Sequence, residues 1–210
     1  MKKARIYVFG DSIAYGAWDS QGGWPDRLKR KLHQITLSSN HKLKFQLFNL
    51  GIGGDNSSSL VKRFKNELEV RYRTDWPAVI LIAVGANDTK HTKKSNPLTS
   101  VDQYKANLEK IINTTLQYTD KVILVGIVPV KDEKQLFKGM IFDNKLLVKY
   151  NEVITDLAKK HQLFKVDLSK KFLLDGKELY SRDGVHPNDE GHKVIADLVW
   201  QQLENILYLN

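Results

Sequence analysis

Apolar residues follow two different spacings along this chain, and the two spacings alternate. Short stretches that are apolar throughout or at every second position are typical of β-strands, and they predict strands at 4–9, 43–50, 78–84, 121–130 and 163–166. Between and after them, apolar residues recur every three or four positions, which is typical of helices with one buried face. This spacing predicts helices at about 23–37, 57–73, 101–118, 144–161 and 188–207.

The strict alternation of strand and helix determines the expected fold class. Connections long enough to hold a helix imply parallel pairing of the strands with right-handed crossovers. We therefore predict an α/β fold, a three-layer α/β/α sandwich around a five-stranded parallel sheet. The chain has 210 residues and shows no internal repeat or linker, so we expect one domain over 1–210. Segments 14–22, 131–142 and 167–182 are expected to be mainly loops.

Composition excludes several classes of protein. The chain has no cysteine, which excludes disulfides, thiolate metal sites and cysteine nucleophiles. No apolar run approaches the length of a membrane helix, and the first apolar run is too short for a signal-peptide core and has no small-residue cleavage site after it. These features predict a cytoplasmic protein with no stable membrane insertion.

The net charge of +9 leaves two interpretations open. A lysine-rich solvated surface is the simpler one, and binding to nucleic acid or another acidic partner is the alternative. The densest basic clusters, at 29–31, 93–94 and 170–171, are short and not interleaved with aromatic residues. Because base-stacking surfaces need such aromatics, we expect no nucleic-acid partner.

Candidate chemistry gathers in four polar or glycine-rich turns, at 10–12, 49–55, 85–88 and 183–188. Three of them directly follow predicted strands, and the fourth precedes the last helix. The carboxyl ends of parallel strands lie at one edge of a sheet, where open α/β proteins place their ligands. The first three turns should therefore meet there, and the fourth can join them if its loop returns to that edge.

The contents of these turns match a serine hydrolase. Ser12 supplies a hydroxyl, and His186 is a candidate base. Asp183 lies three residues before His186, so its carboxylate can reach imidazole Nδ1 across a tight turn and fix the tautomer. The Ser12 N–H, the Gly54 N–H and the Asn87 side-chain amide are candidate donors to an oxyanion.

Each of these residues also has a purely structural interpretation. Asp11 and Ser12 are common helix caps, the glycines can form a tight turn, and single Asp and His residues are weak signals. Other chemistries fit less well, because the chain lacks Gly-x-Ser-x-Gly, Gly-x-Gly-x-x-Gly, a Walker A motif and His-Glu-x-x-His. A metal site with His192 is not favoured, since His192 falls inside the last predicted helix.

The four turns together resemble the blocks of the SGNH, or GDSL, hydrolases, and the resemblance spans nearly the whole chain. The matching residues are Gly10-Asp11-Ser12, Gly54, Gly85-x-Asn87-Asp88 and Asp183-x-x-His186-Pro187. The resemblance implies a flavodoxin-like sandwich, Ser12, Asp183 and His186 as catalytic residues, and Ser12, Gly54 and Asn87 as the oxyanion hole. Ile13 departs from the family's leucine, and Gly54 is preferred to Gly53 because it directly precedes the polar Asp55.

The resemblance implies a small-molecule ester substrate, with no metal or cofactor, and leaves acyl, acetyl and thioester substrates open. Asp11, Phe137, Met140 and Phe142 are predicted to contact substrate; for the apolar three, a satellite hydrophobic cluster under the 131–142 loop is the structural alternative. Two other functions remain open: a non-catalytic flavodoxin-like module binding an anionic small molecule, and a basic nucleic-acid-associated protein. The oligomeric state is not predicted.

Overall fold

The computed structural model describes residues 2–92, 95–131, 139–174 and 176–208. Its strands are β1 (Lys3–Gly10), β2 (Lys44–Gly51), β3 (Ala78–Ala83), β4 (Val122–Val125) and β5 (Phe164–Val166). Its α-helices are α1 (Ser12–Tyr15), α2 (Gly23–Ser38), α3 (Ser57–Arg71), α4 (Val101–Thr115), α5 (Asn144–Lys160), α6 (Ser169–Leu174) and α7 (Asp189–Tyr208). Short 3-10 turns cover Asn87–Thr89 and Gly176–Glu178.

The five strands form one parallel sheet in the order β2-β1-β3-β4-β5. This is the strand order of flavodoxin-like folds, and it confirms the predicted α/β sandwich. Gly10 at the end of β1 pairs with Gly51 on one side and with Ala83 on the other. The three strands therefore end level with one another, which brings the turns that follow them to one edge.

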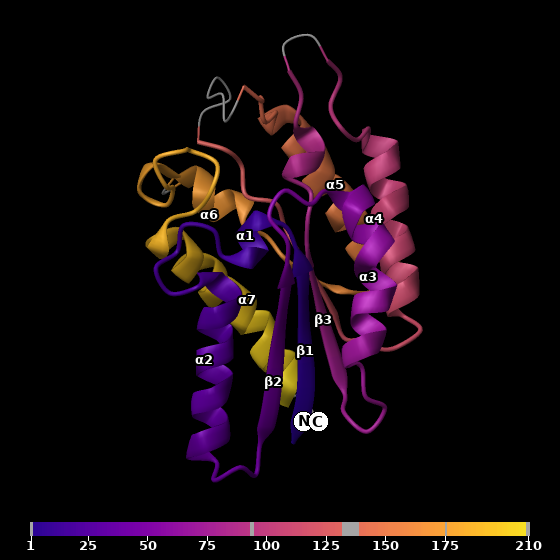
Figure 1. Ribbon diagram of the computed structural model, residues 1–210, viewed down its shortest axis with the longest axis vertical. Coiled ribbons are helices and arrows are strands. Elements are labelled where there is room, and N and C mark those ends of the chain that lie inside the picture. Colours follow the sequence, from indigo (N-terminus) through magenta and orange to yellow (C-terminus); the bar gives the residue numbers. More distant parts are fainter. Residues whose placement is uncertain (1, 93–94, 132–138, 175, 209–210) are drawn as a thin grey trace.

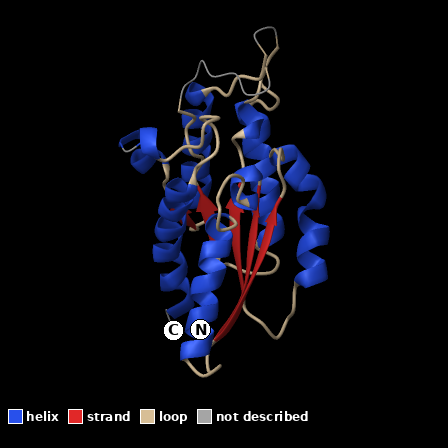
Figure 2. Cartoon of the chain, turned by 60° about the vertical axis from the view of Figure 1, so that its left-hand side comes forward, coloured by secondary structure: helices blue, strands red, loops and turns tan. Residues whose placement is uncertain are grey.

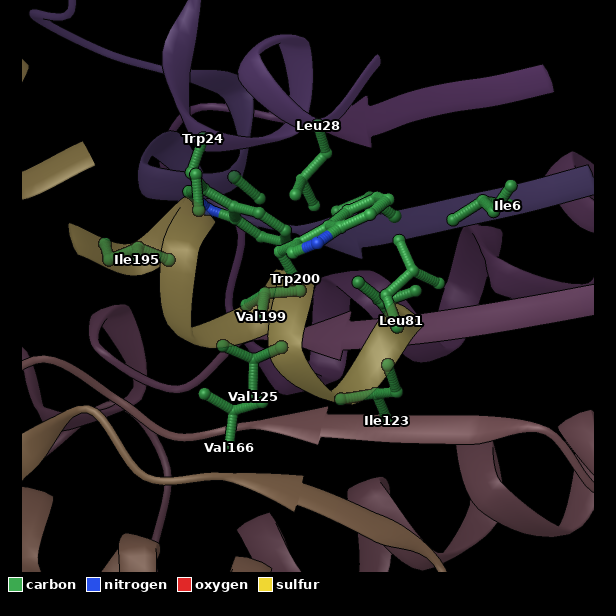
Figure 3. Close-up of a cluster of buried hydrophobic side chains, with 14 of the residues drawn as sticks. Ile6, Trp24, Leu28, Leu81, Ile123, Val125, Val166, Ile195, Val199 and Trp200 are labelled. Atoms are coloured by element: carbon green, nitrogen blue, oxygen red, sulfur yellow. The ribbon is translucent and has the colours of Figure 1, made fainter. Parts of the chain in front are cut away.

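Helices cover both faces of the sheet (Figures 1 and 2). On one face, α2 and α7 pack on alternate residues of the strands, and Figure 3 shows Trp24, Leu28 and Trp200 meeting Leu81 and Val125 in this core. On the other face, α3, α4 and α5 cover the remaining strand residues. Because β1, β3 and β4 are buried on both faces, they read as continuous apolar runs in the sequence.

Two local expectations were wrong. The strand predicted at 121–130 ends at Val125. At Ile127 and Val130, the backbone groups bond the side chains of Asn151 and Asn144 instead of a neighbouring strand. Asn151 bonds both the N–H and the C=O of Ile127, and Asn144 does the same for Val130. The loop predicted at 14–22 begins inside a helix, because residues 14 and 15 belong to the single helical turn α1.

The topology fixes where a ligand should bind. The chain leaves β1 through α2 on one face towards β2, and it leaves β3 through α4 on the other face towards β4, so the connections diverge between β1 and β3. Flavodoxin-like sheets bind their ligands in the crevice at this switch point. Among the described residues, no helix is long and apolar enough to cross a membrane.

Candidate active site

Ser12 is the first residue of α1, and Figure 1 shows α1 beside the carboxyl end of β1. Gly10 is required there, because a Cβ on it would lie 2.3 Å from the carbonyl oxygen of Ala83 and 2.6 Å from Ala14. Asp11 then caps the helix by accepting a hydrogen bond from the Ile13 N–H at 2.9 Å. Capping by Asp11 thus holds Ser12 at the first helical position.

Ser12, His186 and Asp183 form a continuous hydrogen-bonded chain. The Ser12 Oγ lies 2.8 Å from Nε2 of His186, across 174 positions of sequence. His186 Nδ1 lies 2.7 Å from Oδ2 of Asp183. With the proton on Nδ1 bonded to the carboxylate, Nε2 presents its lone pair to the serine hydroxyl. This is the geometry in which an imidazole can take a proton from a serine.

The Asp183 carboxylate accepts five hydrogen bonds. Its Oδ1 receives the Ser181 hydroxyl at 2.7 Å and the backbone N–H groups of Val185 and His186, each at 2.9 Å. Its Oδ2 receives His186 Nδ1 and the indole N–H of Trp18. Burial acts to raise the pKa of Asp183, but the bonds from the His186 backbone, Ser181, the His186 ring and Val185 together lower it to about 2. The carboxylate therefore stays ionised at neutral pH.

Two of the three predicted oxyanion donors, Gly54 and Asn87, lie on loops that are bonded to each other. The Asn87 side-chain amide donates to the carbonyl of Asp55 at 2.8 Å, which ties the turn after β3 to the turn after β2. An amide carries two N–H donors, and this bond uses one of them. Gly54 precedes Asp55 and has φ +87°, a left-handed conformation that favours glycine. The glycine at 54 is thus required by the backbone conformation rather than by space.

Arg63 on α3 connects the ends of β1 and β2, a role that the sequence did not reveal. Its guanidinium donates to the carbonyls of Gly10 at 3.0 Å and Leu50 at 2.9 Å. It also pairs with the Asp55 carboxylate at 2.6 Å, next to Gly54. The only advance signal is an arginine two turns into a helix, which is too common to interpret alone.

Asp88, the residue after Asn87, anchors the start of α3. Its carboxylate accepts the Ser57 N–H at 2.9 Å and the Ser57 hydroxyl at 2.5 Å, and Asn107 donates to the same hydroxyl. Burial raises the pKa of Asp88. Burial likewise raises the pKa of Asp11 to about 7. Both carboxyl groups support the turns that carry the site.

The residues predicted to contact substrate fall in different environments. Asp11 is 3% exposed, and its carboxylate is engaged with the helix that it caps. Phe142 is also 3% exposed and packs with Val130 and Val185, as expected of the satellite hydrophobic cluster. Met140 is half-buried, and Phe137 lies outside the described residues. Contact of these residues with substrate stays a prediction.

His192 has both ring nitrogens bonded to the backbone. Its Nδ1 accepts the Trp24 N–H at 3.3 Å, and its Nε2 lies 3.1 Å from the carbonyl of Ala17. Burial lowers the pKa of this imidazole, so it is neutral at physiological pH. Among the described residues, no cluster of three or more His, Cys, Asp or Glu side chains could hold a metal ion.

Residues 8–194 match the GDSL-like Lipase/Acylhydrolase family. The chain belongs to this family. It is accordingly a GDSL, or SGNH, carboxylic ester hydrolase, as the four sequence blocks indicated.

Two curated relatives and two solved structures extend the match. An arylesterase of Vibrio mimicus is 24% identical over 200 residues, covering 95% of this chain and 88% of the relative. The uncharacterized lipoprotein YqeF of Bacillus subtilis is 24% identical over 182 residues, covering 80% of this chain and 72% of the relative. A lipase/acylhydrolase from Enterococcus faecalis aligns with a TM-score of 0.77 at 23% identity, covering 97% and 96% of the two chains. The acetylxylan esterase Axe2 of Geobacillus stearothermophilus aligns with a TM-score of 0.74 at 20% identity, again covering 97% of this chain and 96% of the other.

Proposed function

We propose that this GDSL-family hydrolase cleaves small carboxylic esters through an acyl-enzyme on Ser12. The observation that carries the proposal is the unbroken chain from the Ser12 Oγ through His186 to Asp183, with links of 2.8 and 2.7 Å. A serine hydroxyl is a weak nucleophile until a base takes its proton, and this chain supplies the base and its orienting acid.

In the proposed acylation step, the Ser12 Oγ attacks the ester carbonyl carbon while His186 Nε2 takes the hydroxyl proton. The tetrahedral intermediate collapses when the bond to the leaving oxygen breaks, and the imidazolium returns its proton to that oxygen. An alcohol leaves. Water then attacks the acyl-enzyme with the same proton transfers, releasing the acid and restoring Ser12.

The oxyanion of each intermediate is assigned to three donors. Ser12 is the first residue of α1, so its N–H has no acceptor within that helix. The Gly54 N–H and the second N–H of the Asn87 amide are the other two. The Asn87–Asp55 bond supports this assignment, because it holds the loops of Gly54 and Asn87 together and uses only one of the two N–H groups of the amide.

The relatives support ester substrates of modest size. One relative is named an arylesterase, and Axe2 is described as an acetylxylan esterase. Two further Axe2 structures are described as catalytic mutants, one with a serine and one with a histidine replaced by alanine. We therefore propose acetyl and other short acyl esters as substrates, with no metal or cofactor in the reaction. We also propose that 1–210 acts as one hydrolase domain.

A fluorophosphonate probe followed by intact-mass measurement tests this function. We expect one adduct on the unaltered protein, no adduct on Ser12→Ala, and loss of p-nitrophenyl acetate hydrolysis in that variant. Ser38→Ala, an exposed serine at the end of α2, is the matched control and should behave as the unaltered protein. Equal turnover by Ser12→Ala and Ser38→Ala would refute the assignment.

The fluorophosphonate experiment separates the esterase from the other two functions left open by the sequence, because neither of them predicts an adduct; two further measurements identify them. A binding module for anions would be stabilised thermally by inorganic phosphate and would gain no adduct. A nucleic-acid-associated protein would bind DNA or RNA with steep salt dependence. The cytoplasmic location stays a prediction.

A further inference from the structure

Trp18 combines an exposed ring with a bonded indole N–H. Its side chain is 63% exposed, which is unusual for a tryptophan. Its Nε1 nevertheless lies 2.9 Å from Oδ2 of Asp183 and 3.1 Å from Nδ1 of His186. The indole meets the imidazole edge-on, with ring centroids 5.9 Å apart and planes at 85°. An exposed ring in one defined position needs a backbone that holds it there.

The backbone of Trp18 is held in an unfavourable conformation. Its φ is +69°, in the left-handed region that bulky residues rarely adopt. The residues on both sides are anchored to α7: the Ala17 carbonyl is bonded by Nε2 of His192, and Ser20 donates its N–H and hydroxyl to Asp189. Strain of this kind persists only where surrounding contacts determine the conformation.

Asp19 anchors the same loop from the other side. Its fully buried carboxylate receives the Gly23 N–H at 2.9 Å and a two-pronged bond from Arg27 at 2.8 and 2.9 Å. Burial opposes ionisation of Asp19, but the Arg27 and Gln21 bonds lower its pKa to about 2. The loop is therefore fixed at Ala17, Asp19 and Ser20, and Trp18 lies between these anchors.

Proton counting decides which of the two short contacts of the indole N–H is a hydrogen bond. His186 Nδ1 must carry a proton to bond Asp183 Oδ2 at 2.7 Å, so it has no lone pair to offer. The opposite tautomer would place two lone pairs against each other there, and would turn an N–H toward the Ser12 hydroxyl. The indole proton is therefore donated to Asp183 Oδ2.

We propose that Trp18 is a positioning residue of the Ser12–His186–Asp183 site, a role that rests on the proposed esterase function. Its N–H fixes the rotation of the Asp183 carboxylate, so that Oδ2 stays in line with His186 Nδ1. Its ring covers the Asp183–His186 bond, whose two side chains are 16% and 9% exposed. Trp18 acts through Asp183 and takes no part in bond making.

Two substitutions separate the N–H from the ring. Trp18→Phe keeps an aromatic cover and removes the donor, and Trp18→Ala removes both. Trp76→Phe is the matched control, because Trp76 stacks under Lys3 and Arg5, away from the switch point. Since Trp18 is largely exposed, the melting temperature of Trp18→Phe should stay close to that of the control.

The kinetic readout is the division of the effect between kcat and KM for p-nitrophenyl acetate. We expect Trp18→Phe to lower kcat about tenfold with KM within about twofold, as for the partial loss of a charge-assisted bond that acts in the transition state. Trp18→Ala should lower kcat further, because water then reaches the Asp183–His186 bond. A rise in KM with kcat unchanged would instead make Trp18 a substrate contact and overturn the proposal.

The spectroscopic readout is the low-field proton resonance of His186 Nδ1–H. In Trp18→Phe, Oδ2 accepts one bond fewer and becomes a stronger acceptor for His186, so this resonance should move downfield, while Trp76→Phe leaves it in place. An unmoved resonance refutes the N–H bond, and a moved resonance with unchanged kcat refutes the positioning role. If the unaltered protein neither hydrolyses ester nor gains an adduct, the proposed function fails, and the resonance still tests the Trp18 bond.

Discussion

Asp183→Asn is the substitution whose consequences the structure defines most closely. The side chain keeps its size, but five donors converge on the carboxylate and an amide offers only one oxygen. That oxygen should turn toward the Oδ1 side, where three donors lie, two of them backbone N–H groups. The amide NH₂ then faces His186 Nδ1, which must become an acceptor.

The catalytic cost follows from the tautomer. With its proton moved to Nε2, His186 presents an N–H to the Ser12 hydroxyl and cannot take its proton. The corresponding change in a Ser-His-Asp triad costs about 10⁴ in kcat. We expect a loss of that order, with KM changed little, because Asp183 lies behind the imidazole and away from the serine.

The cost in stability depends on pH. A folded pKa of about 2, against about 3.9 for an unfolded aspartate, corresponds to about 2.6 kcal/mol, and partial solvent screening reduces this to about 1–2 kcal/mol. Because the folded pKa is lowered, this stabilisation is present above pH ~4 and is lost as the pH falls towards ~2. The variant should therefore melt about 2–8 °C lower at pH 7, with the gap narrowing below pH ~4.

Steady-state kinetics and thermal melts from pH 7 down to pH 2 test both parts. Asp120→Asn is the control, because Asp120 is 88% exposed at the opposite end of β4. The reasoning is refuted if Asp183→Asn keeps kcat within tenfold of the control. A melting difference independent of pH would refute the electrostatic part alone.

Two further substitutions test the oxyanion loops. Asn87→Ala should lower kcat about 10²–10³-fold with little change in KM, because it removes one donor to the oxyanion. A raised KM with kcat unchanged would contradict that role. Arg63→Met should lower both the melting temperature and kcat, because it leaves the Asp55 carboxylate unpaired and releases the turn after β2; the cost should be about 2–4 kcal/mol. Its control is the exposed Arg73→Met, and equal melting of the two arginine variants would show that Arg63 is not needed.

Much of the site was accessible from the sequence because its parts lie at strand ends. The apolar run of β1 located Ser12, and the run of β3 located Asn87, since parallel strands end at a common edge. The pairing of Asp183 with His186 was accessible because the two residues are three apart in one turn. The limits of β4 were not accessible, because the side chains that replace its partners come from α5.

Contacts made across long stretches of chain could not be predicted. Trp18 carries no local sign that its indole N–H will meet Asp183, 165 residues later. Arg63 carries none that it will bond Gly10, 53 residues earlier. Phe142 was predicted equally well as a pocket wall or as a satellite cluster, and burial against Val185 decided its environment.

The sequence alone determined the layers and the parallel sheet and predicted the candidate residues of a serine hydrolase site, because apolar spacing sets which faces are buried and strand ends collect at one edge. Only the tertiary structure decided the strand order, the 2.8 Å approach of Ser12 to His186 and the bond from the Trp18 indole N–H to Asp183. Those features depend on how helices from distant parts of the chain pack on the sheet. Packing sets distances to within a fraction of an ångström, and a linear pattern of residue types carries no such information.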